Sequence, residues 1–326
     1  MEIIAEIAQG FEGNEKLAEL LAIGAIQSGA DSVKYQLIIG DELCVPGYQY
    51  YDFFKSLEMS DSVWLKIIEM VKSKKKNFYF DVYGEISLET ASRLGASGIK
   101  ISTTDFYNRG LLRSAIGNFK DIFLSVGGIP IEDVEQMVKE IDFHDQQVTL
   151  MYGFQAEPTP VGENNLLRLE RLRAKFPDFG IGFMDHSDGS SEEAFYLPLM
   201  AASLGVSCIE KHLTLDPLLE IEDYVSALEP SKFSKFVEII KTMIPALGTQ
   251  NFDLTDKEKE YRNKAGKVVV ASRDIQPGEI LKAADFNLKR VSTEFSNEWF
   301  IKIEDLVGKK IKQNISYNSP ITKEMI

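Results

Sequence analysis

Two histidines at the ends of apolar runs are the side chains best suited to chemistry in this sequence. His186 follows the run 180–185 and His212 follows the run 206–211, each with an acidic residue one or two positions before it. Neutral imidazole is the commonest metal ligand in proteins, and two imidazoles with carboxylates nearby can hold one divalent ion. A single histidine on an apolar segment is more often a core residue, but this pair predicts a metal site. The third histidine, His144, lies in a polar stretch and is expected at the surface.

Two lysines lie in similarly apolar surroundings. Lys34 and Lys100 each stand within a short β-like run. A buried lysine is costly unless it is paired, so two lysines at one site suggest a bound anion. The hydroxyls of Thr103 and Ser125 could add donors to a phosphate. A Schiff-base aldolase is the other use of a barrel lysine, but it needs one lysine rather than a pair beside a metal.

The elements that must position these groups are eight short β-rich runs separated by helical patterns. Such an alternation over about 250 residues predicts an α/β fold, a (β/α)8 TIM barrel. An open doubly wound sheet is the alternative, but it usually carries a Gly-rich phosphate loop, which is absent here. The expected strands are Ile3–Ile7, Ser32–Ile38, Phe78–Val82, Gly98–Ser102, Ile122–Val126, Val148–Tyr152, Ile181–Met184 and Cys208–Leu213.

The predicted strand ends gather the polar residues. Enzymes of this fold carry their chemistry at the C-terminal ends of the strands. Strand ends can also be polar simply because they meet solvent. The residues in question are Glu6, Lys34, Gln36, Asp81, Lys100, Ser102, Ser125, Asp185, His186, Glu210 and His212.

The character of the sequence changes after Gly248. We expect the barrel to span residues 1–248, followed by a polar, charge-dense linker over 249–265 with room for one helical turn. Residues 266–326 contain short strand-like runs and a Pro-Gly turn, which predict a small β-rich module. A module of this size has a limited core, so docking onto another surface would help to stabilise it.

Composition narrows the class of protein. Of 326 residues, 44% are hydrophobic and 26% are charged, as in ordinary globular proteins. The net charge of −14 argues against a nucleic-acid partner, although a few lysines in one pocket can still attract a small anion. Apolar runs are too short for a membrane span, and no signal peptide or disulfide framework is indicated. We therefore expect a cytoplasmic protein without a membrane partner.

A series of motifs resembles the sialic acid synthase (N-acetylneuraminate synthase) family across nearly the whole chain. Enzymes of that family condense phosphoenolpyruvate with an N-acetylated hexosamine. The C-terminal module resembles the antifreeze-like SAF domain, a β-clip, that they carry. Each motif is weak alone, but their order and spacing are specific. The matching segments are Ile4–Ile7, Gly29–Gln36, Ile99–Ile101, Ser125–Gly127, Pro158–Pro160, Gly182–His186, Glu210–Asp216 and Asp223–Pro230.

The resemblance implies roles for individual residues. His186 and His212 would bind a divalent metal, usually manganese, with magnesium or cobalt as other options. The residues implied to hold substrate are Lys34, Lys100, Thr103, Ser125 and Gln155. Those implied to surround the reacting carbons and the sugar are Glu6, Gln36, Asp105, Glu210 and Asp223. The resemblance also implies a domain-swapped homodimer in which Arg290 reaches the acceptor in the partner subunit.

Several positions depart from the family pattern. Gly10-Phe11 replaces an Asn-His pair, and Met184 replaces a serine. Asp81 stands where a threonine usually joins the phosphate site, and an ionised carboxylate there would repel phosphate. Glu157 stands where a tyrosine is expected. The metal and phosphoenolpyruvate half of the site is therefore mostly retained, whereas the acceptor half differs.

The function predicted from these observations is a metal-dependent condensation of phosphoenolpyruvate with an aldose that resembles an N-acetylhexosamine. The products would be a sialic-acid-like nonulosonic acid and phosphate. Two alternatives remain open because fold does not fix function. One is a synthase that acts on another aldehyde, such as a phosphorylated aldose. The other is a binding homologue that has lost catalysis.

Overall fold

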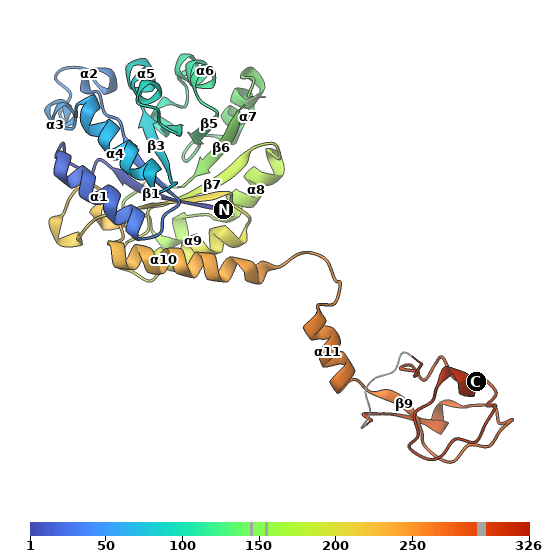
Figure 1. Ribbon diagram of the computed structural model, residues 1–326. Coiled ribbons are helices and arrows are strands. Elements are labelled where there is room, and N and C mark those ends of the chain that lie inside the picture. Colours follow the sequence, from blue (N-terminus) through green and yellow to red (C-terminus); the bar gives the residue numbers. More distant parts are fainter. Residues whose placement is uncertain (144–145, 154–155, 292–297) are drawn as a thin grey trace. The chain divides into compact units, whose positions relative to one another are not determined.

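The computed structural model describes residues 1–143, 146–153, 156–291 and 298–326. The chain divides into two compact units, Met1–Gly248 and Thr249–Ile326 (Figure 1). Across the described part of the chain, no helix combines the length and apolarity needed to cross a membrane.

The first unit is a closed barrel of parallel strands in sequence order, in which β1 also pairs with β8. This closed barrel confirms the fold predicted from the alternation of strands and helices. The strands are β1 (Glu2–Ala8), β2 (Ser32–Gln36), β3 (Asn77–Val82), β4 (Gly98–Ile101), β5 (Asp121–Ser125), β6 (Gln147–Tyr152), β7 (Gly180–Asp185) and β8 (Cys208–His212).

Helices surround the barrel (Figure 1). Local sequence sets where they begin: the Asn14 side chain accepts the N–H groups of Lys16 and Leu17 at the start of α1, and Pro230 opens α10. The α-helices of this unit are α1 (Glu15–Gln27), α2 (Gly40–Leu43), α3 (Tyr51–Ser56), α4 (Asp61–Ser73), α5 (Glu85–Arg93), α6 (Arg109–Asn118), α7 (Ile131–Glu140), α8 (Leu167–Lys175), α9 (Glu193–Ser203) and α10 (Pro230–Met243).

The barrel interior is layered because side chains alternate between its two faces. On β1, Ile3, Ala5 and Ile7 belong to the core between strands and helices, whereas Ile4 belongs to a separate buried cluster. We call this cluster the floor. Its members are Ile4, Tyr79, Phe123, Met151, Met184 and Cys208. On β1, β3, β5 and β8, a polar residue lies two positions after the floor residue and so on the same face of the strand. These polar residues are Glu6, Asp81, Ser125 and Glu210.

The second unit contains α11 (Asp256–Ala265), β9 (Val268–Ala271) and β10 (Phe286–Lys289), the two strands being antiparallel. The sequence allowed one turn of helix before the module, but α11 has 10 residues. A capping box explains its start, because Thr255 and Glu258 each accept the other's backbone N–H. The small core of this unit is Val269, Ala271, Ile275, Leu281, Phe286, Leu306, Ile311, Ile315 and Ile321.

Candidate active site

The C-terminal ends of the barrel strands enclose a cavity of about 370 Å³. Most of its lining comes from the strand ends, and the remainder comes from the segments after β6 and β8. This arrangement follows from the parallel barrel, in which all strands end at the same side. The lining residues are Glu6, Gln36, Asp81, Lys100, Ser102, Glu157, Met184, His186, Glu210, His212 and Asp223.

Two buried lysines meet three buried carboxylates at the base of this cavity. Lys34 Nζ contacts the carboxylate of Glu6, lies 2.6 Å from Asp81 Oδ1 and lies 3.4 Å from Glu210 Oε2. Lys100 Nζ lies 2.6 Å from Glu210 Oε1 and 3.4 Å from Asp81 Oδ2. The sequence predicts that these lysines bind an anion. Because the chain's own carboxylates pair with them, their burial does not by itself require a bound ligand.

The electrostatics of this network distribute its protons unequally. Burial raises the pKa of Glu6, Lys34 opposes this rise and the neighbouring carboxylates add to it, so that the pKa is about 8. Burial alone would also raise the pKa of Glu210, but Lys100 and Lys34 lower it to about 2. At neutral pH Glu6 is therefore mostly protonated and Glu210 is ionised.

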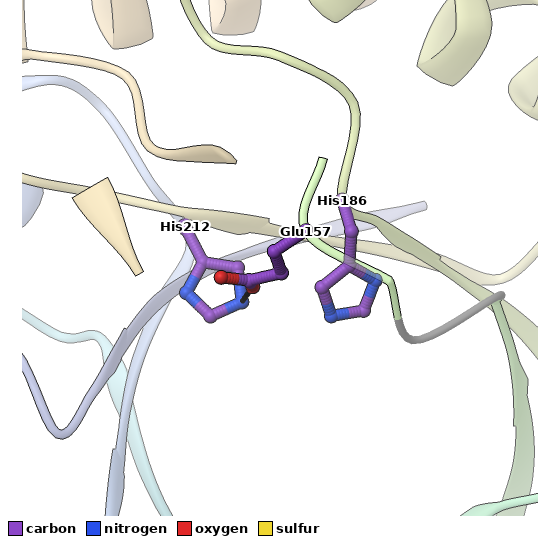
Figure 2. A group of neighbouring side chains, drawn as sticks. All are labelled: Glu157, His186 and His212. Carbon is purple, nitrogen blue, oxygen red and sulfur yellow. Dashed lines mark ion pairs between the residues drawn. The ribbon is translucent and has the colours of Figure 1, made fainter. Parts of the chain in front are cut away.

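The two histidines lie close together, from the ends of neighbouring strands (Figure 2). Their ring centroids lie 5.3 Å apart. Burial lowers the pKa of both imidazoles, that of His186 to about 3, so both are neutral and have a lone pair free for a ligand. His186 Nδ1 is buried and has no hydrogen-bond partner among the described residues. The prediction that the two histidines lie together is thus matched by their placement.

Glu157 joins this pair, although the sequence analysis did not predict it as a ligand. Its Oε1 lies 3.6 Å from His212 Nε2, and one ligand atom from each of Glu157, His186 and His212 lies within 4.8 Å of the others. The backbone explains its position, since Thr159 N–H donates to the His186 carbonyl at 2.8 Å. The segment after β6 therefore lies against the end of β7. The glutamate at a position where the resemblance expects tyrosine was the only sequence signal.

The other residues expected at the site are distributed unevenly. Gln36 lines the cavity and accepts a hydrogen bond from Gln9 Nε2 at 2.7 Å. Thr103 and Ser125 lie together, with 2.6 Å between their hydroxyl oxygens, but neither is among the cavity-lining residues. Asp105 lies in the 3-10 helix η1 (Thr103–Asp105), also outside the lining.

Two expected residues lie outside the described part of the barrel. Gln155 falls outside the described residues. Arg290 belongs to the second unit, where its Nε donates to the Ala265 carbonyl at 3.0 Å.

The departures from the family pattern have different structural roles. Phe11 is fully buried and packs against Tyr35 and Trp64, so the Gly10-Phe11 change belongs to the core. Met184 belongs to the floor and lines the cavity, with its Sδ 3.8 Å from Ser125 Oγ. Asp81 is part of the lysine–carboxylate network, at the centre of the site.

Comparisons with known proteins extend over the whole chain. The sequence model of the NeuB family matches residues 22–252, and that of the SAF domain matches residues 266–326. An N,N'-diacetyllegionaminic acid synthase of Legionella pneumophila is 24% identical over 343 residues, which cover 99% of this chain and 94% of that protein. A spore coat polysaccharide biosynthesis protein of Bacillus subtilis is 28% identical, with 85% of this chain and 80% of that protein covered. The crystal structure of an N-acetylneuraminic acid (sialic acid) synthetase from Leptospira borgpetersenii, in complex with citrate, aligns with a TM-score of 0.74 at 26% identity, covering 81% of this chain and 91% of that one.

Proposed function

This chain belongs to the NeuB family, and from that premise we propose that it condenses phosphoenolpyruvate with an aldose to form a nonulosonic acid and phosphate. The family match confirms the resemblance read from the motifs. The observation that carries the proposal is one cavity lined by both a lysine–carboxylate network and a pair of neutral histidines. Relatives named as legionaminic acid synthase and N-acetylneuraminic acid synthetase support this class of product.

The residues present fit a divalent metal. His186 and His212 are neutral, close together and, in the case of His186 Nδ1, buried without a hydrogen-bond partner in the described structure. These are the properties of imidazoles that hold a metal. An ion held there, manganese in our proposal and magnesium or cobalt as alternatives, would act as a Lewis acid on the aldehyde oxygen of the acceptor.

The two lysines position the donor in this proposal. Lys34 and Lys100 exchange part of their pairing with Asp81 and Glu210 for the phosphate and carboxylate of phosphoenolpyruvate. C3 of the donor then forms the new bond to the aldehyde carbon, and positive charge develops at C2. Thr103 and Ser125, which lie together after β4 and at the end of β5, would hold the remaining donor oxygens through their hydroxyls.

Glu210 and Glu6 differ in protonation, so each can carry out a different proton transfer in the proposed reaction. Glu210 is ionised, so it can stabilise the charge at C2 and accept a proton from the water that adds there. Glu6 is mostly protonated at neutral pH, so it can donate a proton to the oxygen that becomes the new hydroxyl. The bond between C2 and the phosphate oxygen then breaks. The proton of the hydroxyl on C2 passes to the departing phosphate, and the 2-keto acid remains. Gln36, Asp105 and Asp223 would contact the sugar.

We further propose that the enzyme works as a swapped homodimer in the cytoplasm. Arg290 would contact the acceptor in the partner's barrel, and Gln155 would contribute from the segment after β6. The two cysteines, Cys44 and Cys208, are both free, which suits a reducing compartment.

A panel of acceptors tests the proposed reaction. The full-length protein is incubated with phosphoenolpyruvate, Mn²⁺ and N-acetylated hexosamines, phosphorylated aldoses or simple aldehydes in turn. Phosphate release and the mass of the product acid are the readouts, and His212→Ala is the inactive control. An N-acetylhexosamine is expected to give a nonulosonic acid. Turnover of a phosphorylated aldose alone would identify the alternative synthase. Absence of phosphate release with every acceptor would contradict the proposal and favour the binding homologue.

A further inference from the structure

Glu157 lies where a third ligand would complete the metal site. We propose that Glu157 binds the ion together with His186 and His212, so that this chain has a two-histidine, one-carboxylate site. The inference rests on the proposed metal at the two histidines and goes beyond it in assigning a carboxylate ligand and its consequence for the choice of metal.

The distances between the possible ligand atoms of Glu157, His186 and His212 are close to those around a single ion. Two ligand atoms of one ion lie roughly 3 to 3.5 Å apart, because each metal–ligand bond is about 2.1 Å long. The 3.6 Å between Glu157 Oε1 and His212 Nε2 is already close to that separation. The His186 ligand atom completes a group whose members all lie within 4.8 Å, so small side-chain rotations bring all three into one coordination shell. Figure 2 shows the Glu157 carboxylate beside the His212 ring, on the side that faces His186.

The carboxylates on either side of His212 indicate which of its ring nitrogens would bind the ion. Asp223 Oδ2 lies 3.7 Å from His212 Nδ1, on the ring nitrogen that Glu157 does not face. This separation is longer than a hydrogen bond, but it leaves the side of the ring at Nε2 to Glu157. We take His212 Nε2 as the ligand atom because it is the nitrogen that Glu157 approaches.

The backbone fixes Glu157 relative to the two histidines. The His186 carbonyl accepts a hydrogen bond from Thr159 N–H at 2.8 Å and another from Ser226 Oγ at 3.1 Å. The first bond ties the segment that carries Glu157 to the end of β7. The second ties the 3-10 helix η4 (Tyr224–Ser226), which follows Asp223, to the same carbonyl. Ligands held in this way need little reorganisation when an ion binds.

A carboxylate ligand changes what the site can do. It adds a negative charge and a hard oxygen donor to two imidazoles, a combination that suits six-coordinate Fe²⁺, Mn²⁺ or Co²⁺. Three protein ligands on such an ion still leave positions for substrate oxygens. In this chain, Glu157 would thus set the affinity for the ion in the absence of substrate.

Binding of Co²⁺ to the metal-free full-length protein tests the assignment. The dissociation constant and the visible absorption of bound Co²⁺ are measured for the wild type, Glu157→Gln, Glu157→Asp and His212→Ala. Glu163→Gln is the matched control, because Glu163 is an exposed glutamate six positions further along the same segment. We expect Glu157→Gln to weaken Co²⁺ binding by about 100-fold and to alter the absorption spectrum. Glu157→Asp should recover part of the affinity, and Glu163→Gln should match the wild type.

The possible outcomes separate this inference from the proposed reaction. If Glu157→Gln binds Co²⁺ with wild-type affinity and spectrum while His212→Ala loses binding, the site has two histidine ligands and the inference is wrong. If the wild type itself fails to bind Co²⁺, the inference and the proposed metal both fail. Phosphate release by the wild type with phosphoenolpyruvate and an aldose is measured separately, and it reports on the reaction whichever ligands hold the ion.

Discussion

Asp81 is expected to weaken binding of the donor, and replacing it by asparagine should strengthen that binding. The carboxylate of Asp81 occupies both lysines, 2.6 Å from Lys34 and 3.4 Å from Lys100. Phosphoenolpyruvate must compete with it for the same ammonium groups and is repelled by it. Asp81→Asn retains the shape of the side chain and removes the charge, so it isolates the electrostatic effect from a change in packing.

The size of the effect follows from the contact distances. An anion oxygen and the Asp81 carboxylate that share one lysine lie at most about 5 Å apart, since each contact is about 2.7 Å long. Two unit charges at about 5 Å repel by about 3 kcal/mol at an effective dielectric constant of about 20. This energy corresponds to roughly 100-fold in the dissociation constant, before any change in the protonation of Glu6 is included.

Glu6 reduces that gain in a way that can be measured. The negative charge of Asp81 is one of the causes of the raised pKa of Glu6, so Asp81→Asn should lower it. More Glu6 is then ionised in the free variant and must take up a proton when the anion binds. We therefore expect a net tightening of about tenfold or more at neutral pH, with proton uptake on binding that the wild type shows to a smaller extent.

Titration calorimetry with phosphoenolpyruvate in two buffers of different ionisation enthalpy gives both quantities. Asp31→Asn is the control for the loss of one negative charge. Asp31 pairs with Lys241 at 2.7 Å and lies just before the first residue of β2, whereas the cavity lies at the C-terminal ends of the strands. Asp81→Asn should remain folded because Lys34 keeps Glu6 and Glu210 as partners. Unchanged or weaker binding by folded Asp81→Asn would refute the reasoning and remove Asp81 from the anion site.

Three further predictions concern the proton, the metal and the dimer. Glu6 has its usual pKa of 4.5 in the unfolded state and a pKa of about 8 in the folded state. Between these two pH values the folded protein holds a proton on Glu6 that the unfolded protein releases. The contribution of Glu6 to the free energy of unfolding therefore falls as pH rises from 4.5 to about 8. Glu6→Gln should lose that fall, by up to about 1.4 kcal/mol per pH unit in urea denaturation, and a parallel pH dependence of both proteins would contradict the burial argument. Mn²⁺ should raise the Tm of the wild type and of His144→Ala but not of His212→Ala, which should also release no phosphate; equal shifts in all three would rule out the metal assignment. Arg290→Ala and His212→Ala, each inactive alone, should regain about a quarter of wild-type activity per site when they are mixed and exchange subunits, because half of the dimers are then mixed and each of these has one complete site. No recovery despite proven exchange would exclude the swapped arrangement.

The barrel and the histidine pair were accessible from sequence because both depend on periodicity. Parallel strands with side chains of period two place every second residue inside, and all strands end on one side. His186 and His212, at the ends of β7 and β8, therefore had to lie near each other. The roles assigned to these residues stay predictions.

The pairing of the lysines was not accessible because it depends on strand register. Asp81 lies opposite Lys100 across β3 and β4, and Glu6 lies opposite Lys34 across β1 and β2. A shift of one residue would have placed other side chains there. Glu157 was missed for a different reason. It lies outside any strand, where no periodicity indicates the direction of a side chain, and a hydrogen bond from Thr159 to His186 helps to fix its segment.

The floor of the barrel has a consequence for the order in which substrates bind and products leave. Its six side chains form a buried cluster inside the barrel, and Gly182 leaves the room that Met151 needs. Lys34 is fully buried, whereas the side chain of Glu157 is 28% exposed, so the lysines lie deeper than the carboxylate at the histidines. On the proposed reaction, the donor would have to enter before the sugar covers it. Phosphate, left beside the lysines after the bond to C2 breaks, would leave only after the sugar acid has departed.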